Sequence, residues 1–208
     1  MVNSGDPRIG IFAKQVDYQW KGLISGFPPT ETVAAGCSNL NKDVLGDYTS
    51  PYSFMRYDEI LFIRAEAAHK GIVAGGDAAA RQYYNEAILA SIDHWDEINP
   101  STTYKVTEAQ KEQFLNNVYY NNSFEQIMMQ KYVALFWCGY EAYNEYRRTG
   151  YPRLPMGTGT DNNGILPTRL MYPINTSATN RENYLEAVGR MGRDDMKTPV
   201  WWSKKATE

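Results

Sequence analysis

The stretch SFEQIMMQKYVALFWCGYEAYNEYRRTGY, residues 123–151, carries the most complete set of helix signals in the chain. Ser123 followed by Gln126 is a capping-box pattern at its start. Apolar and small residues recur at spacings of three and four along one face, at Met128, Tyr132, Leu135, Gly139, Tyr143 and Tyr146. An arginine pair and Gly150 supply the cations and the glycine typical of a helix end. The stretch is therefore predicted to be one long amphipathic helix, and it carries no catalytic constellation.

Two further helices are predicted before this stretch, about residues 56–70 and from Asp77 to Trp95, joined by a glycine-rich turn. The spacing of Ala80, Tyr84 and Ala87 is similar to that of the second helix of a tetratricopeptide unit, where small residues let paired helices nest. A shorter helix is predicted to begin at the capping-box pattern of Thr107 and Gln110 and to end near Asn117.

The two ends of the chain lack this helical periodicity. Glycines and prolines punctuate residues 1–52, where residues 9–16 and 17–23 could form a short β-hairpin. Residues 152–208 are predicted to be an extended tail with a short helix that follows Asn180. The expected fold is therefore all-α, with tetratricopeptide-like antiparallel helix pairs over residues 53–151 and irregular, partly β segments at the ends. We expect residues 1–208 to form part of a single domain.

Composition excludes some classes of protein. The 208 residues carry a net charge of −3 without a basic block, which argues against nucleic acid as a partner. No window approaches the roughly 18 apolar residues of a membrane-spanning helix, and the first residues do not resemble a secretory signal. Cys37 and Cys138 leave a disulfide open, although Cys138 has the pattern of a small buried apolar residue.

Metal and catalytic patterns are weak. The run Asp161-Asn162-Asn163-Gly164 does not fit a calcium-binding loop, because the first and last ligand positions would be Gly159 and Leu170. The two histidines, His69 and His94, have no cysteine or histidine cluster around them. We therefore expect neither a metal nor another cofactor.

Acidic residues on the helix of residues 56–70 could be proposed as a pair for glycoside hydrolysis, at Asp58, Glu59 and Glu66. A solvated or salt-bridged face is the favoured interpretation. Glu66 lies among apolar residues, and we expect it to form a structural ion pair with Arg147 or Arg148 of the long helix.

Aromatic residues in the irregular segments are the best candidates for ligand contacts. Aromatic rings stack on the apolar faces of sugars, and loops on a rigid scaffold often carry binding residues. Tyr18 and Trp20 lie among polar neighbours and are the first choice, and Tyr48 and Tyr104 are further candidates. Packing beneath the helical body is the alternative for all four.

Several stretches together resemble the SusD/RagB-like outer-membrane lipoproteins of Bacteroidetes. They are SGDPRIGIF, MRYDEILFIRAEAAHKG, IMMQKYVALFWCGYEAYNEYRRTGYPRL, ILPTRLMYPINTSATNRENY and the closing VWW. The resemblance covers nearly the whole chain. It implies tetratricopeptide-like helix pairs and a non-catalytic protein that captures oligosaccharides or other nutrients on the cell-surface side of the outer membrane.

The resemblance also implies a partner, a SusC-like TonB-dependent transporter to which the nutrient is delivered. Members are normally longer and carry an N-terminal signal and a lipid-bearing cysteine, so this chain resembles their C-terminal portion. A membrane link is expected only through such a lipid anchor, which this chain does not contain. The alternative is a helical-repeat scaffold that binds proteins and no sugar, and a glycoside hydrolase is the third possibility.

Overall fold

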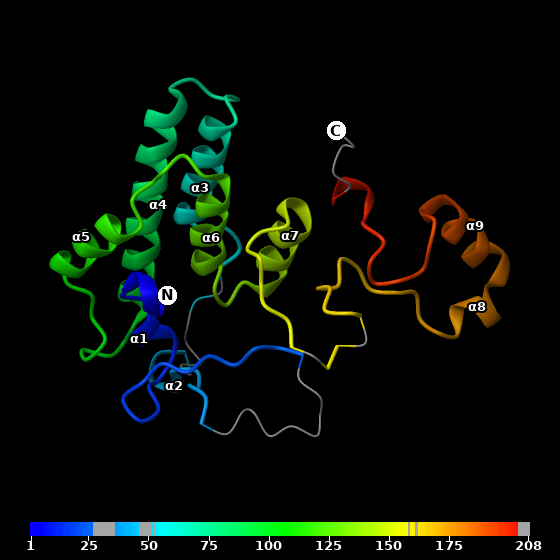
Figure 1. The fold of residues 1–208 in the computed structure, drawn as a ribbon, viewed down its shortest axis with the longest axis horizontal. Coiled ribbons are helices and arrows are strands. Elements are labelled where there is room, and N and C mark those ends of the chain that lie inside the picture. Colours follow the sequence, from blue (N-terminus) through cyan, green and yellow to red (C-terminus); the bar gives the residue numbers. More distant parts are fainter. Residues whose placement is uncertain (27–35, 46–50, 52, 158, 161, 204–208) are drawn as a thin grey trace. The chain divides into compact units, whose positions relative to one another are not determined.

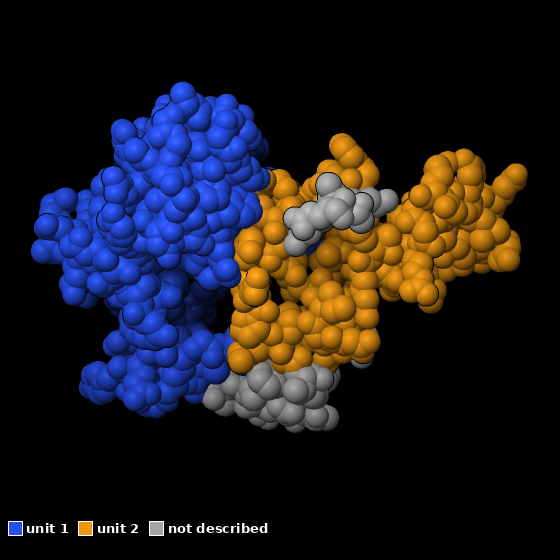
Figure 2. All heavy atoms as spheres, turned by 45° about the horizontal axis from the view of Figure 1, so that its top comes forward, with its two compact units in different colours: residues 1–23, 33–143 blue, residues 24–32, 144–208 orange. Residues whose placement is uncertain are grey.

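The computed structural model describes residues 1–26, 36–45, 51, 53–157, 159–160 and 162–203 (Figure 1). The chain divides into two compact units, coloured separately in Figure 2. Unit 1 comprises residues 1–23 and 33–143, and unit 2 comprises residues 24–32 and 144–208. Each unit is described by itself below.

Unit 1 is built around the helix pair α3 (Tyr57–His69) and α4 (Gly76–Ile98). Helix α3 also packs against α6 (Phe124–Ala134), and α4 contacts both α6 and α5 (Glu108–Asn117) (Figure 1). This arrangement confirms the prediction of a mostly helical, tetratricopeptide-like fold.

The α3–α4 pair is close because small residues occupy its buried faces. Four alanines are almost completely buried on these helices: Ala65, Ala68, Ala80 and Ala87. Large residues fill the space around them, including Phe62, Tyr84 and Ile88, each completely buried. Complete burial of such a side chain contributes roughly 1.5–3 kcal/mol to folding. The small-residue spacing noted in the sequence therefore has a structural role.

Helix α5 begins as the sequence predicts. The Thr107 hydroxyl accepts a hydrogen bond from the backbone N–H of Gln110, and the Gln110 side chain accepts one from the backbone N–H of Thr107. Helix α6 has only half of this arrangement. Ser123 accepts from the backbone N–H of Gln126, but the Gln126 amide donates to the carbonyls of Val118 and Tyr119.

The prediction of one long helix over residues 123–151 is wrong. Helix α6 ends at Ala134, and α7 spans Gly139–Thr149. Between them Trp137 has a left-handed backbone, with φ of 71°. A non-glycine residue in this conformation costs on the order of 1–2 kcal/mol. The turn that carries it places Phe136 against core aromatic residues, and these contacts offset that cost.

The N-terminal segment is anchored by a buried ion pair. Arg8 is completely buried and donates to both carboxylate oxygens of Asp6, at 2.9 and 2.7 Å. The same guanidinium donates to Ser91 Oγ of α4 at 2.9 Å and to Gln130 Oε1 of α6 at 3.0 Å. Asp6 and Arg8 thus link this segment to two helices of unit 1.

The β structure expected near the N-terminus is smaller than predicted. Residues Ile9–Phe12 form a short helix, α1, because a helical turn brings the side chains of Ile11 and Phe12 into the core. A tight turn at Asp17 and Tyr18, both with positive φ, pairs Val16 with Gln19 as an isolated bridge. A second bridge joins Ala13 to Leu40, shortly before α2 (Lys42–Leu45).

Unit 2 contains the second part of α7, the short helix α8 (Thr176–Thr179) and α9 (Arg181–Met191). The predicted helix after Asn180 is confirmed. Arg169 forms an ion pair with Asp194 at 3.0 Å, so the segment before α8 is tied to the segment after α9. Single turns of 3-10 helix lie at Val2–Ser4 in unit 1 and Trp201–Ser203 in unit 2. Among the helices of the described ranges, none is long and apolar enough to cross a membrane.

Candidate ligand-binding pocket

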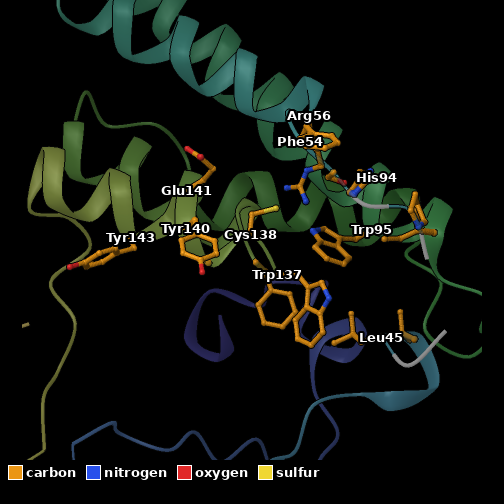
Figure 3. Close-up of a pocket in the computed structure, with 16 residues that line it drawn as sticks. Leu45, Phe54, Arg56, His94, Trp95, Trp137, Cys138, Tyr140, Glu141 and Tyr143 are labelled. Atoms are coloured by element: carbon orange, nitrogen blue, oxygen red, sulfur yellow. The ribbon is translucent and has the colours of Figure 1, made fainter. Parts of the chain in front are cut away.

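A cavity in unit 1 has a volume of about 670 Å³ (Figure 3). Five segments form its walls: α2, the residues just before α3, the C-terminal part of α4, the connection between α6 and α7, and the start of α7. The break in the predicted long helix therefore builds one wall. We call this cavity the aromatic pocket, because its lining includes Phe54, Trp95, Phe136, Trp137, Tyr140 and Tyr143.

A chain of ring contacts runs from the core to the pocket wall. Phe12 stacks on Phe136 with ring centroids 4.0 Å apart, and Trp95 meets Phe136 edge-on at 5.8 Å. Phe136 in turn lies 5.8 Å from Trp137. Trp95 is only 3% exposed, whereas Trp137 is 61% exposed. The partly buried ring of Phe136, which packs on the buried rings of Phe12 and Trp95, thus supports the exposed indole of Trp137, and this support limits the conformational entropy that Trp137 would lose on binding.

Two further aromatic rings of the pocket face solvent. Tyr140 is 86% exposed and Phe54 is 89% exposed. Figure 3 shows Tyr140 and Tyr143 extending from α7. Aromatic faces offer apolar contact area with a π surface, and Tyr adds a hydroxyl that can donate or accept. The pocket can therefore hold a ligand that combines apolar faces with hydroxyl groups.

The arginine of the pocket lining, Arg56, is already engaged. Arg56 forms a bidentate ion pair with Asp58 at 3.0 and 2.8 Å and also donates to the carbonyl of Ala134. Its guanidinium lies 5.5 Å from the centre of the Trp95 ring, and Figure 3 shows the two side chains together. These contacts hold the Arg56 side chain in place beside Trp95, and its charge is balanced by that of Asp58.

Two titratable groups of the pocket are held in their neutral forms. Burial lowers the pKa of His94 below its ordinary value of 6.5, and the positive charge of Arg56 lowers it further. Burial raises the pKa of the Cys138 thiol. Cys37 and Cys138 do not form a disulfide with each other, so the pairing left open by the sequence is not formed.

Two of the four predicted ligand residues lie together elsewhere. Trp20 and Tyr104, 84 positions apart, both line a second cavity of about 410 Å³ in unit 1. Tyr18 lies at the tip of the nearby tight turn and is 95% exposed. Tyr48 lies outside the described residues. The binding role of all four residues stays a prediction.

The sequence also predicts an ion pair between Glu66 and Arg147 or Arg148. Glu66 pairs with Lys70 on its own helix at 2.6 Å. Arg148 pairs with Glu145 at 2.7 Å, and the Arg147 guanidinium donates to Asn144 and lies 4.7 Å from the Trp202 ring centre. Glu66 belongs to unit 1 and both arginines to unit 2, so their pairing stays a prediction.

Sequence reasoning misses the aromatic pocket. It places Phe136, Trp137 and Tyr140 in a continuous helix, where their spacing indicates only a wide apolar face. A signal is present in the run Phe136-Trp137-Cys138-Gly139-Tyr140, because its rings would point in several directions from one helix. In the part of the chain that the structure describes, no group of three or more His, Cys, Asp or Glu side chains could hold a metal.

Comparison with known proteins places this architecture in a family. The SusD-like model described as "Starch-binding associating with outer membrane" matches residues 1–173. The chain therefore belongs to the SusD-like family, and outer-membrane association follows from that membership. No curated protein sequence matches the chain.

Solved structures agree with this assignment. A chitin-binding protein is 29% identical with a TM-score of 0.81 over 98% of this chain and 48% of its own. A SusD homologue from Bacteroides fragilis is 29% identical with a TM-score of 0.80 over 97% of this chain and 50% of its own. A Bacteroidetes SusD-like protein is 27% identical with a TM-score of 0.70 over 86% of this chain and 35% of its own. The chain thus spans about half the length of the first two.

Proposed function

We propose that this chain binds an oligosaccharide in the aromatic pocket and does not cleave it. The observation that carries the proposal is Trp137, an exposed indole in a strained backbone conformation, supported from behind by Phe136 and the core. Strained backbone concentrates at functional sites. Stacking of a sugar face on Trp137, with hydroxyl contacts to neighbouring polar atoms, is the binding mode that this wall favours.

The comparisons support the ligand class. The family description names starch binding, and the relative with the TM-score of 0.81 is described as chitin-binding. Because this chain matches about half of that relative, the ligand of the longer protein is carried over here only as a proposal. We therefore choose chitohexaose, the β-1,4-linked hexamer of N-acetylglucosamine, as the first probe.

The pocket composition supports binding without hydrolysis. Glycoside hydrolases usually place two carboxyl groups on either side of the bond to be cleaved. Within the described lining of the aromatic pocket, Glu141 supplies the one carboxyl group. We further propose, from the family, that the complete protein acts on the cell-surface side of the outer membrane and delivers its ligand to a SusC-like TonB-dependent transporter.

A calorimetric titration with chitohexaose tests the proposal. Truncating an anchoring aromatic residue at a binding site costs about 2 kcal/mol, which is roughly a thirtyfold loss of affinity. We expect Trp137→Ala to show this loss. Trp201→Ala, which removes another exposed indole outside the pocket lining, is the matched control and should bind as the wild type does. Equal affinity in the wild type and Trp137→Ala would refute the site.

A second candidate function is favoured by the outer face of α3. Tyr57, Ile60 and Ile63 lie three residues apart on this helix, and all three are exposed. Exposed apolar patches commonly mark protein interaction sites. This face supports the alternative of a helical-repeat scaffold. Failure of chitohexaose and other neutral oligosaccharides to bind the wild type would favour the scaffold.

The smaller cavity remains a proposed secondary site. Trp20 and Tyr104 supply its aromatic surface, but Lys105 of its lining already donates to the carbonyls of Asp96 and Asn99. Gln110, also in its lining, is engaged in the capping box of α5. Fewer of its polar groups are therefore free to meet a ligand, so we place the main site in the aromatic pocket.

A further inference from the structure

We infer that the aromatic pocket selects uncharged oligosaccharides and rejects anionic ones, such as glycans that carry uronate groups. The inference rests on the proposed function, since it names the class of sugar that the same pocket accepts. Three observations about the charged and titratable groups of the lining support it: the engagement of Arg56, the neutrality of His94 and the exposure of Glu141.

The first observation is that the pocket offers no unmatched positive charge within its described lining. Arg56 and His94 are its two basic side chains. The Arg56 guanidinium is fixed by both carboxylate oxygens of Asp58, and the Arg56 side chain is only 9% exposed. An incoming carboxylate would have to displace Asp58, which is itself buried and would then lose its partner.

His94 does not replace Arg56 as a binding partner for anions. Its partly buried ring lies edge-on to Trp95, with centroids 5.5 Å apart. Burial and the adjacent Arg56 charge lower its pKa, so the ring is uncharged at neutral pH. A neutral imidazole can form a hydrogen bond to an anion but does not compensate its charge.

The remaining charge in the lining is negative. Glu141 lies at the start of α7 and is exposed beside the pocket. An anionic group that enters the pocket is therefore repelled by Glu141, and it also loses hydration without gaining a cation in return. A neutral sugar is not repelled, and its apolar face can still stack on Trp137 or Tyr140.

The expected effect follows from Coulomb's law. A ligand carboxylate about 8 Å from Glu141, at an effective dielectric constant of about 20 to 80, binds about twofold to thirtyfold more weakly than its neutral counterpart. The hydration that the ligand carboxylate loses in the pocket weakens binding further. We therefore expect the charged ligand to bind about tenfold more weakly than the neutral one at low salt. Because the repulsion is screened, the difference should shrink as the salt concentration rises.

The test compares two ligands that share one backbone. Chitohexaose is neutral, and its C6-oxidised derivative has a carboxylate in place of each hydroxymethyl group. Affinities of both are measured by calorimetry for the wild type, for Glu141→Gln, and for the control Glu112→Gln, which removes an exposed charge of α5 outside the pocket lining. We expect Glu141→Gln to strengthen binding of the oxidised hexamer about threefold relative to chitohexaose, and Glu112→Gln to leave the ratio of the two affinities as it is in the wild type.

The outcomes separate this inference from the proposed function. Equal or tighter binding of the oxidised hexamer by the wild type would overturn the charge selection and leave oligosaccharide binding intact. An equal gain in Glu141→Gln and Glu112→Gln would overturn the role of Glu141. If neither hexamer binds the wild type, the proposed function fails and the inference fails with it.

Discussion

The buried Asp6–Arg8 pair should be one of the most sensitive points of unit 1. In the variant Arg8→Met the side chain remains long and apolar, but Asp6 is left buried without its cation. Four side-chain hydrogen bonds are lost, two to Asp6 and one each to Ser91 and Gln130. Removing one partner of a buried ion pair costs about 3–5 kcal/mol. We expect the free energy of unfolding to fall by about 4 kcal/mol.

The double variant Asp6→Asn/Arg8→Met separates charge from packing. The introduced amide would be neutral, and its oxygen could still accept from the backbone N–H of residue 8, as the Asp6 carboxylate does at 3.0 Å. Replacing both charged partners of a buried pair costs much less than removing one. We expect a loss of about 1–2 kcal/mol, so the double variant should be more stable than Arg8→Met alone.

Urea unfolding followed by far-ultraviolet circular dichroism measures both variants, and the unfolding midpoint and slope give the free energy. If Arg8→Met is unfolded in water, a folded double variant supports the same reasoning. A loss below about 1 kcal/mol in Arg8→Met, or a double variant less stable than the single one, would refute the assigned role of the pair.

Two further perturbations test local features. Thr107→Ala removes the capping box of α5 and should lower the free energy of unfolding by about 1 kcal/mol, and an unchanged urea midpoint would contradict this. The folded state disfavours protonated His94, so the stability of the wild type should fall as the pH drops below 6.5, by at most about 1.4 kcal/mol per pH unit. In His94→Gln this part of the pH dependence should be absent, and a persistent slope of the same size between pH 7 and 5 would assign it to other groups.

Local signals are sufficient to predict most helices. The limits of α3 and α5 and the position of α4 follow from periodicity, turn glycines and the Thr107 capping box, all of which act within a few residues, whereas α4 begins one residue before the predicted Asp77 and ends at Ile98 and not at Trp95. The helix after Asn180 follows in the same way. These helices depend on capping residues, turn glycines and apolar spacing, which can be read from the sequence.

Features set by distant contacts are not predictable in the same way. The left-handed Trp137 depends on Phe136 packing against Phe12, which is 124 positions away. Helix α1 replaces a predicted strand because Ile11 and Phe12 enter the core with Val44 and Trp95. The burial of Arg8 requires partners 83 and 122 positions away. The apolar spacing within one segment does not show which distant residues it will contact.

The candidate site likewise has one part that the sequence predicts and one part that depends on distant contacts. Aromatic residues in irregular segments are a useful general guide, since Trp20 and Tyr104 do line one cavity. The larger pocket escapes prediction because its wall is a helix break that only tertiary packing explains.

The most direct test of the central claim is to observe the tryptophans while an oligosaccharide binds. The chain has five tryptophans, at positions 20, 95, 137, 201 and 202, and each gives one indole N–H resonance in a two-dimensional NMR spectrum. Single Trp→Phe variants assign the signals of Trp20, Trp137 and Trp201. We predict that chitohexaose shifts the Trp137 resonance in a saturable manner and leaves Trp20 and Trp201 unchanged. Saturable binding that shifts Trp20 and not Trp137 would contradict the claim and place the site in the smaller cavity.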